Sequence, residues 1–445
     1  MREKMSRKGL VKVVMVAGFM LVLPFTAIAA GFVNGRVLDF ETKKPIEGAV
    51  ITGNNEIVYT NNAGAFEITN AASRIGIRAH GYARGEQTLA AYPGKKSFDI
   101  YLLPFNPKAL YLTFYGIGDR SLRESALKLV RETELNAFVI DVKGDRGLIT
   151  YKSSIPLASE IGAQKLIIIK DMRETIRMLR EKGVYTIARI VVFKDNLLAE
   201  ARPDLAIRTQ EGKIWRDREN LLWVDPSRKE VWDYNIKIAE EAAQQGFDEI
   251  QFDYVRFPDR RGLKFQVQNT QEERVKSITG FLMESKKRLA LHNVFISADI
   301  FGYVPWNLDD TQIGQKIEAV ASCVDYISLM LYPSGFQFGI PGYRNPVAHP
   351  YEIVSLSLKK ARERANIPAV RFRPWIQAFR DYAFDRRSFS GPEIREQIRA
   401  SDEVGTNGWM LWNPRNVYEA DGLKPEPQAT KVALRKTESE GVRRP

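Results

Sequence analysis

The chain has 445 residues, enough for two domains, and its content of 44% hydrophobic and 27% charged residues is that of an ordinary globular protein. The formal charge of +12 is concentrated near the ends, because residues 1–30 carry a net charge of +4 and the segment from Lys424 onward carries +3. The remaining +5 is spread over about 390 residues, and no nucleic-acid motif occurs, which argues against a nucleic-acid partner.

Residues 1–30 have the pattern of an export signal. A basic start precedes an apolar run at residues 13–23, and the small residues Ala27 and Ala29 form a cleavage pattern. The apolar run is short for a membrane span, and an uncleaved membrane anchor is the alternative. We therefore expect an exported protein, periplasmic or extracellular. Because Cys323 is the one cysteine, the protein has no internal disulfide, and Cys323 is expected to be buried.

Residues 31–104 have the pattern of a small all-β domain, with short alternating runs separated by turn signals such as Asn-Asn-Ala-Gly at residues 61–64. The string Gly-Arg-Val-Leu-Asp-Phe at residues 35–40, with Ala-His-Gly-Tyr at residues 79–82, resembles the carboxypeptidase regulatory-like domain, a β-sandwich. The resemblance implies a module without catalytic residues, in which His80 is structural. One role open to such a module is association with the cell envelope.

From residue 108 onward, strand patterns alternate with helix patterns. The predicted strands are residues 109–116, 137–144, 185–193, 249–257, 294–302, 326–334, 371–379 and 408–414. The predicted helices are residues 121–134, 167–182, 227–245, 270–291, 311–321, 350–365 and 391–404. This alternation predicts an α/β fold, a (β/α)₈ TIM barrel over residues 108–420. A doubly wound open sheet is the alternative, but the turn after the first strand lacks a glycine-rich phosphate pattern. The tail at residues 424–445 is predicted to be disordered.

The fourth predicted strand carries Asp253 within an apolar run, where an unpaired carboxylate is unfavourable. Because strand side chains alternate between two faces, Gln251 and Asp253 are predicted to point into the barrel. The same sorting, applied to the other strands, predicts a mouth at their carboxyl ends, where barrel enzymes have their active sites. The mouth would collect Asp141, Lys143, Arg189, Asp253, Asp299 and Gln377, with the aromatic residues Tyr115, Trp306, Tyr332, Trp375 and Trp412.

Carboxylates beside flat aromatic rings favour a carbohydrate ligand, because the acids transfer protons and the rings stack on sugars. The aspartates could instead hold a divalent cation, or pair structurally with Arg189 or Lys143 inside the barrel. The chain has three histidines, and neither His292 nor His349 lies at a strand end. A zinc or iron site and Ser-His or Cys-His catalysis are therefore not expected. No metal and no organic cofactor are predicted.

Several stretches of the predicted barrel carry a resemblance to a known family. They include Asn-Ala-Phe-Val-Ile-Asp-Val-Lys at residues 136–143, Trp-Val-Asp-Pro at residues 223–226 and Asp-Glu-Ile-Gln-Phe-Asp-Tyr-Val-Arg-Phe-Pro at residues 248–258. Residues 108–420 resemble the putative glycosyl hydrolase domain family of bacterial barrels. The resemblance implies a glycosidase-like barrel whose active site surrounds Asp253, since related barrels carry a catalytic carboxylate at the end of the fourth strand.

The partner of Asp253 has to be chosen from the remaining acids. Many barrel glycosidases place the second acid on the sixth or seventh strand, but here those strands end in Tyr332 and Gln377. Asp299, at the end of the fifth strand, is the first choice. Asp381 follows the seventh strand and could reach the mouth, whereas Asp325 precedes its strand and is expected at the opposite end.

These residues lead to a hypothesis of glycosidic-bond hydrolysis in an envelope or extracellular polysaccharide. Asp253 would be the nucleophile or charge stabiliser and Asp299 the acid/base, its pKa raised by burial. Arg189 and Arg256 would keep Asp253 ionised and orient substrate hydroxyls. One alternative is a catalytically inactive barrel that binds polysaccharide. Another is a metal-dependent, deacetylase-like hydrolase, which the shortage of histidine disfavours.

Overall fold

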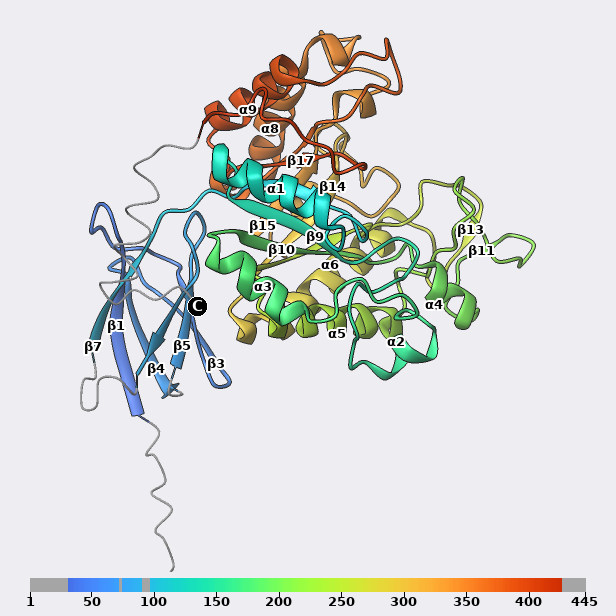
Figure 1. The fold of residues 1–445 in the computed structure, drawn as a ribbon. Helices are drawn as coiled ribbons and strands as arrows, with labels where there is room; N and C mark the ends of the chain where they lie inside the picture. Colours follow the sequence, from blue (N-terminus) through green and yellow to red (C-terminus); the bar gives the residue numbers. More distant parts are fainter. Residues whose placement is uncertain (1–30, 72–73, 90–96, 426–445) are drawn as a thin grey trace, which may run out of the picture.

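The computed structural model describes residues 31–71, 74–89 and 97–425. The predicted export signal and nearly all of the predicted disordered tail lie outside these residues. A β-rich body at the amino-terminal end is joined to a larger barrel surrounded by helices (Figure 1). Within the described ranges, no helix combines the length and the apolar character needed to cross a membrane.

The amino-terminal body consists of two sheets that share one hydrophobic core. The first sheet has the order β4-β1-β7, and the second has the order β3-β2-β5-β6. Alternate residues such as Val33, Val37, Ile75 and Ile77 point into the core, which agrees with the alternating sequence pattern. The strands are β1 (Gly31–Asp39), β2 (Val50–Gly53), β3 (Glu56–Tyr59), β4 (Ala65–Ala71), β5 (Arg74–Arg78), β6 (Gly85–Thr88) and β7 (Ser97–Leu102).

The larger body is a closed parallel barrel with the order β8-β9-β10-β12-β14-β15-β16-β17, which confirms the predicted α/β TIM-barrel fold. Each strand reads as a nearly continuous apolar run because it is covered on both faces. The barrel strands are β8 (Lys108–Leu112), β9 (Ala137–Lys143), β10 (Tyr185–Val191), β12 (Glu249–Asp253), β14 (Phe295–Phe301), β15 (Tyr326–Met330), β16 (Trp375–Gln377) and β17 (Trp409–Trp412).

Helices surround the barrel, and their starts follow capping residues such as Asp119, Asp171 and Thr270, each of which accepts a backbone hydrogen bond. The long helices are α1 (Arg120–Glu132), α3 (Met172–Glu181), α5 (Lys229–Gln245), α6 (Gln271–Leu289), α8 (Pro350–Ala365) and α9 (Gly391–Val404). The shorter elements are α2 (Pro156–Glu160), α4 (Asn196–Ala201), α7 (Ile317–Val320), η1 (Ala290–His292), η2 (Pro333–Gly335), η3 (Pro346–Ala348), η4 (Ala369–Arg371) and the paired strands β11 (Arg208–Thr209) and β13 (Leu263–Lys264).

Two predicted elements are much shorter in the structure. The helix predicted at residues 311–321 is reduced to α7, because Thr311, Gln312 and Gly314 have positive φ angles that a helix does not allow. The strand predicted at residues 371–379 is reduced to β16, since η4 occupies its start and Pro374 has no N–H for the sheet.

The amino-terminal end of the barrel interior contains a buried ionic network. Arg373 Nη1 lies 2.5 Å from Glu249 Oε2, and Glu249 also accepts hydrogen bonds from Tyr185 Oη (3.0 Å) and Ser297 Oγ (2.6 Å). Buried charges require partners of this kind. The network fills the amino-terminal end of the interior. Polar groups border open space at the opposite end, where the strands end.

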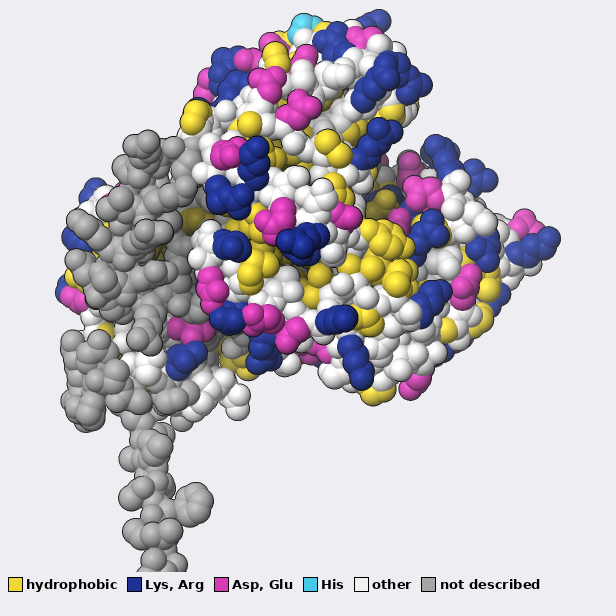
Figure 2. All heavy atoms as spheres, in the orientation of Figure 1, with side chains coloured by type: hydrophobic (Ala, Val, Ile, Leu, Met, Phe, Trp, Pro, Cys, Tyr) yellow, Lys and Arg dark blue, Asp and Glu magenta, His cyan; other side chains and the backbone are white. Residues whose placement is uncertain are grey.

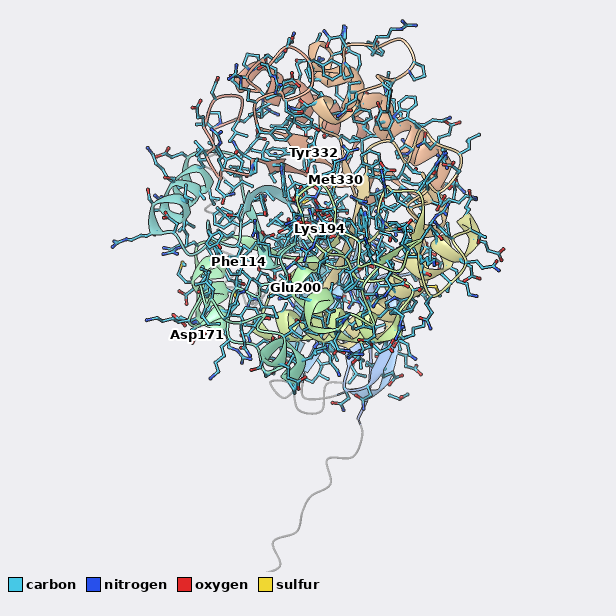
Figure 3. The ribbon with its side chains drawn as sticks, turned by 90° about the vertical axis from the view of Figure 1, so that its right-hand side faces the viewer. Phe114, Asp171, Lys194, Glu200, Met330 and Tyr332 are labelled. Atoms are coloured by element: carbon cyan, nitrogen blue, oxygen red, sulfur yellow. The ribbon has the colours of Figure 1, made fainter. Side chains whose placement is uncertain are left out.

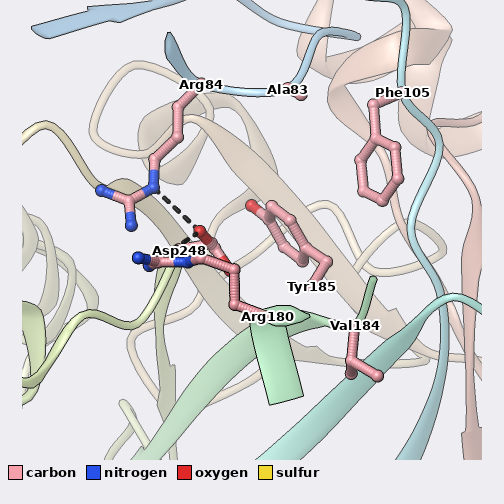
Figure 4. Close-up of a pocket in the computed structure, with 7 residues that line it drawn as sticks. All are labelled: Ala83, Arg84, Phe105, Arg180, Val184, Tyr185 and Asp248. Atoms are coloured by element: carbon pink, nitrogen blue, oxygen red, sulfur yellow. Dashed lines mark hydrogen bonds and ion pairs between the residues drawn. The ribbon is translucent and has the colours of Figure 1, made fainter. Parts of the chain in front are cut away.

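The β-rich body contacts the barrel at its amino-terminal end. Arg84 Nε lies 2.9 Å from Asp248 Oδ1, and the same guanidinium donates to the carbonyls of Gly246 and Asn293. Figure 4 shows Arg84 and Arg180 on either side of Asp248, beside a cavity of about 40 Å³. Because Asp248 lies one residue before β12 and Asn293 two residues before β14, this junction lies opposite the carboxyl ends of the strands.

Candidate active site

A cavity of about 490 Å³ lies at the carboxyl ends of the barrel strands. Its lining includes Asp253 from the end of β12, Phe301 from the end of β14 and Met330 from the end of β15. Figure 3 views the molecule from this side, with Met330 and Tyr332 near the centre. Of the twelve residues predicted for the site, the cavity collects Arg189, Asp253, Arg256, Asp299, Tyr332, Trp375 and Trp412.

Arg189 of β10 links two carboxylates beneath this cavity. Its Nη1 lies 2.6 Å from Asp141 Oδ1, while its Nε and Nη2 lie 2.9 and 2.5 Å from Asp253 Oδ2. Asp141 is held further by Tyr111 Oη (2.6 Å) and by the Phe114 N–H (3.1 Å). Asp141 therefore does not line the cavity but fixes Arg189, which in turn fixes Asp253.

The second oxygen of Asp253 is held by the backbone. The N–H of Tyr254 donates to Asp253 Oδ1 at 2.5 Å. Tyr254 has φ +48°, in the left-handed region that non-glycine residues rarely adopt. Such conformations are unfavourable by roughly 1–3 kcal/mol and cluster at functional sites. The chain therefore leaves β12 through a strained residue whose N–H is directed at the carboxylate.

Asp299 of β14 is the other carboxyl group in the cavity, and its surroundings differ from those of Asp253. Its Oδ1 accepts a hydrogen bond from Trp375 Nε1 at 2.8 Å, while its Oδ2 is buried without a hydrogen-bond partner among the described residues. Burial, followed by the negative charge of Asp253, raises the pKa of Asp299 well above its ordinary value. The arrangement therefore favours a protonated Asp299 beside an ion-paired Asp253.

Gln315 fixes the backbone that carries Asp299. Its Nε2 donates to the carbonyl oxygens of Asp299 (3.1 Å) and Val255 (3.3 Å), and its Oε1 accepts from the N–H of Phe301 (2.9 Å). Gln315 thus ties the residues that follow β12 to the end of β14. This side chain was not among the predicted site residues, because it lies in an irregular segment with no pattern that marks it.

Aromatic rings form much of the cavity wall. The Trp412 ring stacks on Tyr111 with centroids 4.1 Å apart and meets the Trp375 ring edge-on at 5.3 Å. The Arg189 guanidinium lies 5.1 Å from the Trp412 ring. Tyr332 lies between Trp412 and Phe379, at centroid distances of 6.4 and 5.6 Å. This wall presents flat apolar faces close to both carboxyl groups.

The structure places Lys143 away from the cavity. Lys143 Nζ lies 2.6 Å from Asp195 Oδ2, with both side chains fully buried, and 5.5 Å from the ring of Tyr234 in α5. The β9–β10 register shifts after the Asp141–Arg189 pair, so that Lys143 pairs with Ile190. This irregularity turns Lys143 toward the helix layer, although strict alternation would place it on the same face as Asp141.

Three more predicted residues lie outside the cavity lining. Tyr115 is exposed in the loop after β8, and Trp306 Nε1 donates to Ser357 Oγ in α8. Gln377 is buried behind the rim, where it accepts from the N–H of Ser334 (3.0 Å) and donates to Ser334 Oγ (2.7 Å). None of these three side chains lines the cavity.

The two other acids considered from the sequence have structural partners. Asp381 accepts from Ser334 Oγ and from three backbone N–H groups of its own loop, and these hydrogen bonds hold its pKa near 2 despite burial. Asp325 lies at the opposite end of the barrel, near His80 and Lys286. Neither residue lines the cavity, so Asp299 is the one of the three that faces it.

Arg256 lines the cavity but does not contact Asp253. Its guanidinium lies between the rings of Trp223 and Tyr254, 5.0 and 5.3 Å from their centroids. Its Nη1 donates to the carbonyl of Phe257 at 3.0 Å. The ion pair with Asp253 therefore belongs to Arg189, whereas Arg256 occupies the rim.

Several lining residues were missed from the sequence. Glu219 reaches the rim from the loop between β11 and α5, where its Oε2 lies 2.8 Å from Lys194 Nζ. No local pattern marks it, because it precedes β12 by about thirty residues. Phe379 and Tyr382 lie two and five residues after the end of β16, so their position after a strand end could have indicated them. In the ranges that the structure describes, no group of three or more His, Cys, Asp or Glu side chains could hold a metal ion.

Comparisons with known proteins place this geometry in a family. The family model described as "Putative glycosyl hydrolase domain" matches residues 109–418. No curated protein matches the chain. The glycoside hydrolase domain of PgaB (BpsB) from Bordetella bronchiseptica is similar in fold, with 13% identity, 73% of this chain and 100% of that chain covered, and a TM-score of 0.53.

Two further solved structures are similar at lower TM-scores. A hypothetical protein from Ruminiclostridium thermocellum shares 38% identity over 43% of this chain and 96% of its own, with a TM-score of 0.39. The spore cortex-lytic enzyme SleL from Bacillus megaterium shares 12% identity over 72% of this chain and 75% of its own, with a TM-score of 0.44.

Proposed function

The chain belongs to the putative glycosyl hydrolase domain family, and from this premise we propose that it is an exported glycoside hydrolase of an envelope or extracellular polysaccharide. One observation carries the proposal. Asp253 and Asp299, from the adjacent strands β12 and β14, line the same cavity in different electrostatic states. A carboxyl group kept protonated by its surroundings, next to an ion-paired carboxylate, is what acid-assisted glycoside cleavage requires.

Asp299 takes the role of the acid. Burial and the charge of Asp253 favour its protonated form, and Asp299 is one of the residues that line the cavity proposed to hold the glycosidic oxygen. Trp375 holds Oδ1, which leaves Oδ2 as the oxygen that carries the transferable proton. Proton transfer to the leaving oxygen would then break the bond to the sugar carbon.

Asp253 takes the role of the negative charge beside the reacting sugar. A developing oxocarbenium ion is stabilised by a fixed carboxylate, and Arg189 with the Tyr254 N–H fixes this one. Trp412 and Tyr332 supply ring faces for sugar units on either side of the cleaved bond, whereas the fully buried Trp375 positions Asp299. No step in this scheme requires a metal or an organic cofactor.

The proposal is tested by hydrolysis assays on a panel of bacterial polysaccharides with wild-type protein and the Asp253→Asn and Asp299→Asn variants. We expect the wild-type protein to release sugars from at least one polysaccharide, and each variant to lose roughly 100- to 10,000-fold in kcat. A fully active Asp253→Asn variant on the same polysaccharide would contradict the assignment.

A catalytically inactive, polysaccharide-binding barrel is the second candidate. The observation that favours it is the saturation of Asp253, both of whose oxygens already accept hydrogen bonds from Arg189 and Tyr254. Such a barrel would bind a polysaccharide in the same cavity without releasing sugars. Binding without hydrolysis, unchanged by Asp299→Asn, would select this candidate over the hydrolase.

A further inference from the structure

A second cavity adjoins the candidate active site. It has a volume of about 460 Å³ and shares Glu219, Tyr254 and Arg256 with the first cavity. The rings of Trp215 and Trp223 form part of its wall, with centroids 6.2 Å apart. Because they share these lining residues, the two cavities lie side by side and could hold neighbouring units of one polymer.

The second cavity is lined by more basic than acidic side chains. Three acids, Asp217, Glu219 and Asp259, lie on its wall. The five bases are Lys194, Arg216, Arg218, Arg256 and Arg260. Figure 2 shows Lys and Arg side chains over the lobe of β11 and β13, on the right of the view. The charge of this wall favours a ligand that carries negative charge.

The charge of Lys194 is balanced within the protein. Its Nζ lies 2.8 Å from Glu219, 3.3 Å from Asp217 and 3.6 Å from Asp145. Two of the three lining acids are therefore already engaged by one buried lysine. Within the described residues, neither acid forms an ion pair with another cation of the wall.

Arg256 has no close ion pair of this kind. Within the described part of the chain, no carboxylate lies within 4.0 Å of its guanidinium, and its single hydrogen bond runs from Nη1 to the Phe257 carbonyl. Among the described residues, its Nε and Nη2 make no hydrogen bond within the fold. Burial lowers the pKa of Arg256, although Asp253, Asp259 and Asp217 act on it in the opposite direction. The free edge of this guanidinium thus lies where the two cavities meet.

This geometry fits a planar anion. The Nε and Nη2 groups of a guanidinium form a flat fork that matches the two oxygens of a carboxylate. The rings of Trp223 and Tyr254 flank the guanidinium and restrict its orientation. Building on the proposed function, we propose that Arg256 binds the carboxylate of an acidic sugar next to the cleaved bond, so that the substrate is a uronate-containing polysaccharide.

The test uses binding calorimetry on the full chain with the Asp299→Asn change, so that the ligand is not consumed. The probes are oligomers of galacturonate, mannuronate and glucuronate, each compared with the same oligomer methyl-esterified at its carboxyl groups, plus a neutral glucan oligomer. We expect at least one free acid to bind about 10- to 100-fold more tightly than its ester, as for a hydrogen bond to a charged group. This preference should weaken with added salt.

Variants test whether Arg256 is the residue that causes the preference for the free acid over its ester. Arg256→Gln should bind the acid and its ester equally, and Arg256→Lys should keep part of the preference, since it keeps the charge but loses the fork. Arg208→Gln is the matched control, because Arg208 lies on β11 outside both cavities and bonds to the carbonyls of Gly212 and Pro203. Thermal unfolding of each variant shows that it is folded.

The outcomes separate the two proposals. Equal binding of acids and esters by the protein with Arg256, or a preference that survives in Arg256→Gln, overturns the uronate inference alone. Tighter binding of a sulfated glucan than of every uronate also overturns it, in favour of a different anion. Failure of the wild-type protein to bind or cleave any acidic or neutral polysaccharide overturns the proposed function itself.

Discussion

Replacing Asp299 by Asn removes the proposed proton donor with little change in shape. The asparagine oxygen can still accept the hydrogen bond from Trp375 Nε1, and its amide group replaces a carboxyl oxygen that has no partner in the described structure. An unpartnered buried donor is present before and after the change, so the folded state should lose less than about 1 kcal/mol at acidic pH. The catalytic effect should therefore be separable from a folding defect.

The expected loss in rate follows from the role assigned to Asp299. General acids contribute roughly 100- to 10,000-fold, which corresponds to about 3–5 kcal/mol of activation free energy. The measurement is kcat on the polysaccharide that the wild-type protein cleaves and on a nitrophenyl glycoside of the same sugar. Because the nitrophenyl group leaves without protonation, Asp299→Asn should lower kcat on the nitrophenyl glycoside much less than on the polysaccharide.

The same variant makes a prediction about pH. The pKa of Asp299 in the folded protein lies above its value in the unfolded chain, so the folded state binds this proton more tightly. Wild-type stability should therefore fall as pH rises from about 4 through the folded-state pKa, by about 1.4 kcal/mol for each tenfold tightening of proton binding. Asp299→Asn should not show this fall, and it should also lose the alkaline limb of the pH–rate profile.

Asp381→Asn is the matched control for this experiment. Asp381 is a buried acid near the same rim that does not line the cavity, and its pKa is lowered, not raised. The Asp381→Asn variant should therefore keep the alkaline limb of the pH–rate profile. Equal rate losses for Asp299→Asn on activated and natural leaving groups, or a loss below tenfold, would refute the role of Asp299 as the acid.

Three other changes test the surrounding structure. Arg189→Met leaves Asp141 and Asp253 buried without their shared cation, so it should lower the free energy of unfolding at pH 7 by about 3–5 kcal/mol. A denaturant titration measures this, and a loss below about 1 kcal/mol would contradict it. Trp412→Ala should raise KM by about tenfold in steady-state assays, while the alkaline limb of the pH–rate profile set by Asp299 persists. An unchanged KM would exclude stacking of a sugar on the Trp412 ring. Arg84→Ala should make residues 103–107 sensitive to limited proteolysis without changing kcat, since the Asp248 ion pair lies far from the cavity; unchanged protease resistance would contradict the role of that pair.

The barrel was predictable from the sequence because it depends on a repeated pattern. Apolar strand runs and capped helices alternate along the chain, and each pair of neighbours meets in a closed sheet. Asp253 and Asp299 were also found, since each is a carboxylate within an apolar strand and both point inward. The export signal, the family of the amino-terminal body and the envelope association remain predictions.

The parts that escaped prediction depend on local irregularity and on long-range contacts. A single register shift in β9 turns Lys143 outward, and alternation alone cannot reveal such a shift. The positive φ of Tyr254 gives Asp253 its second hydrogen bond, although neighbouring residues in the sequence contain no glycine that would mark a turn. Glu219 and Gln315 reach the cavity from loops, whose paths follow from the folded barrel as a whole.

The junction at Arg84 and Asp248 has a consequence for how the protein could work on a surface. The β-rich body lies at the end of the barrel where the strands begin (Figure 1). The cavity of the candidate active site lies where the strands end. If the protein attaches to a surface through the β-rich body, its attachment site and its substrate-binding cavity lie at opposite ends of the molecule. A polymer strand could then bind and be cleaved at the free end while the protein stays attached. Attachment and substrate binding would not compete for the same surface.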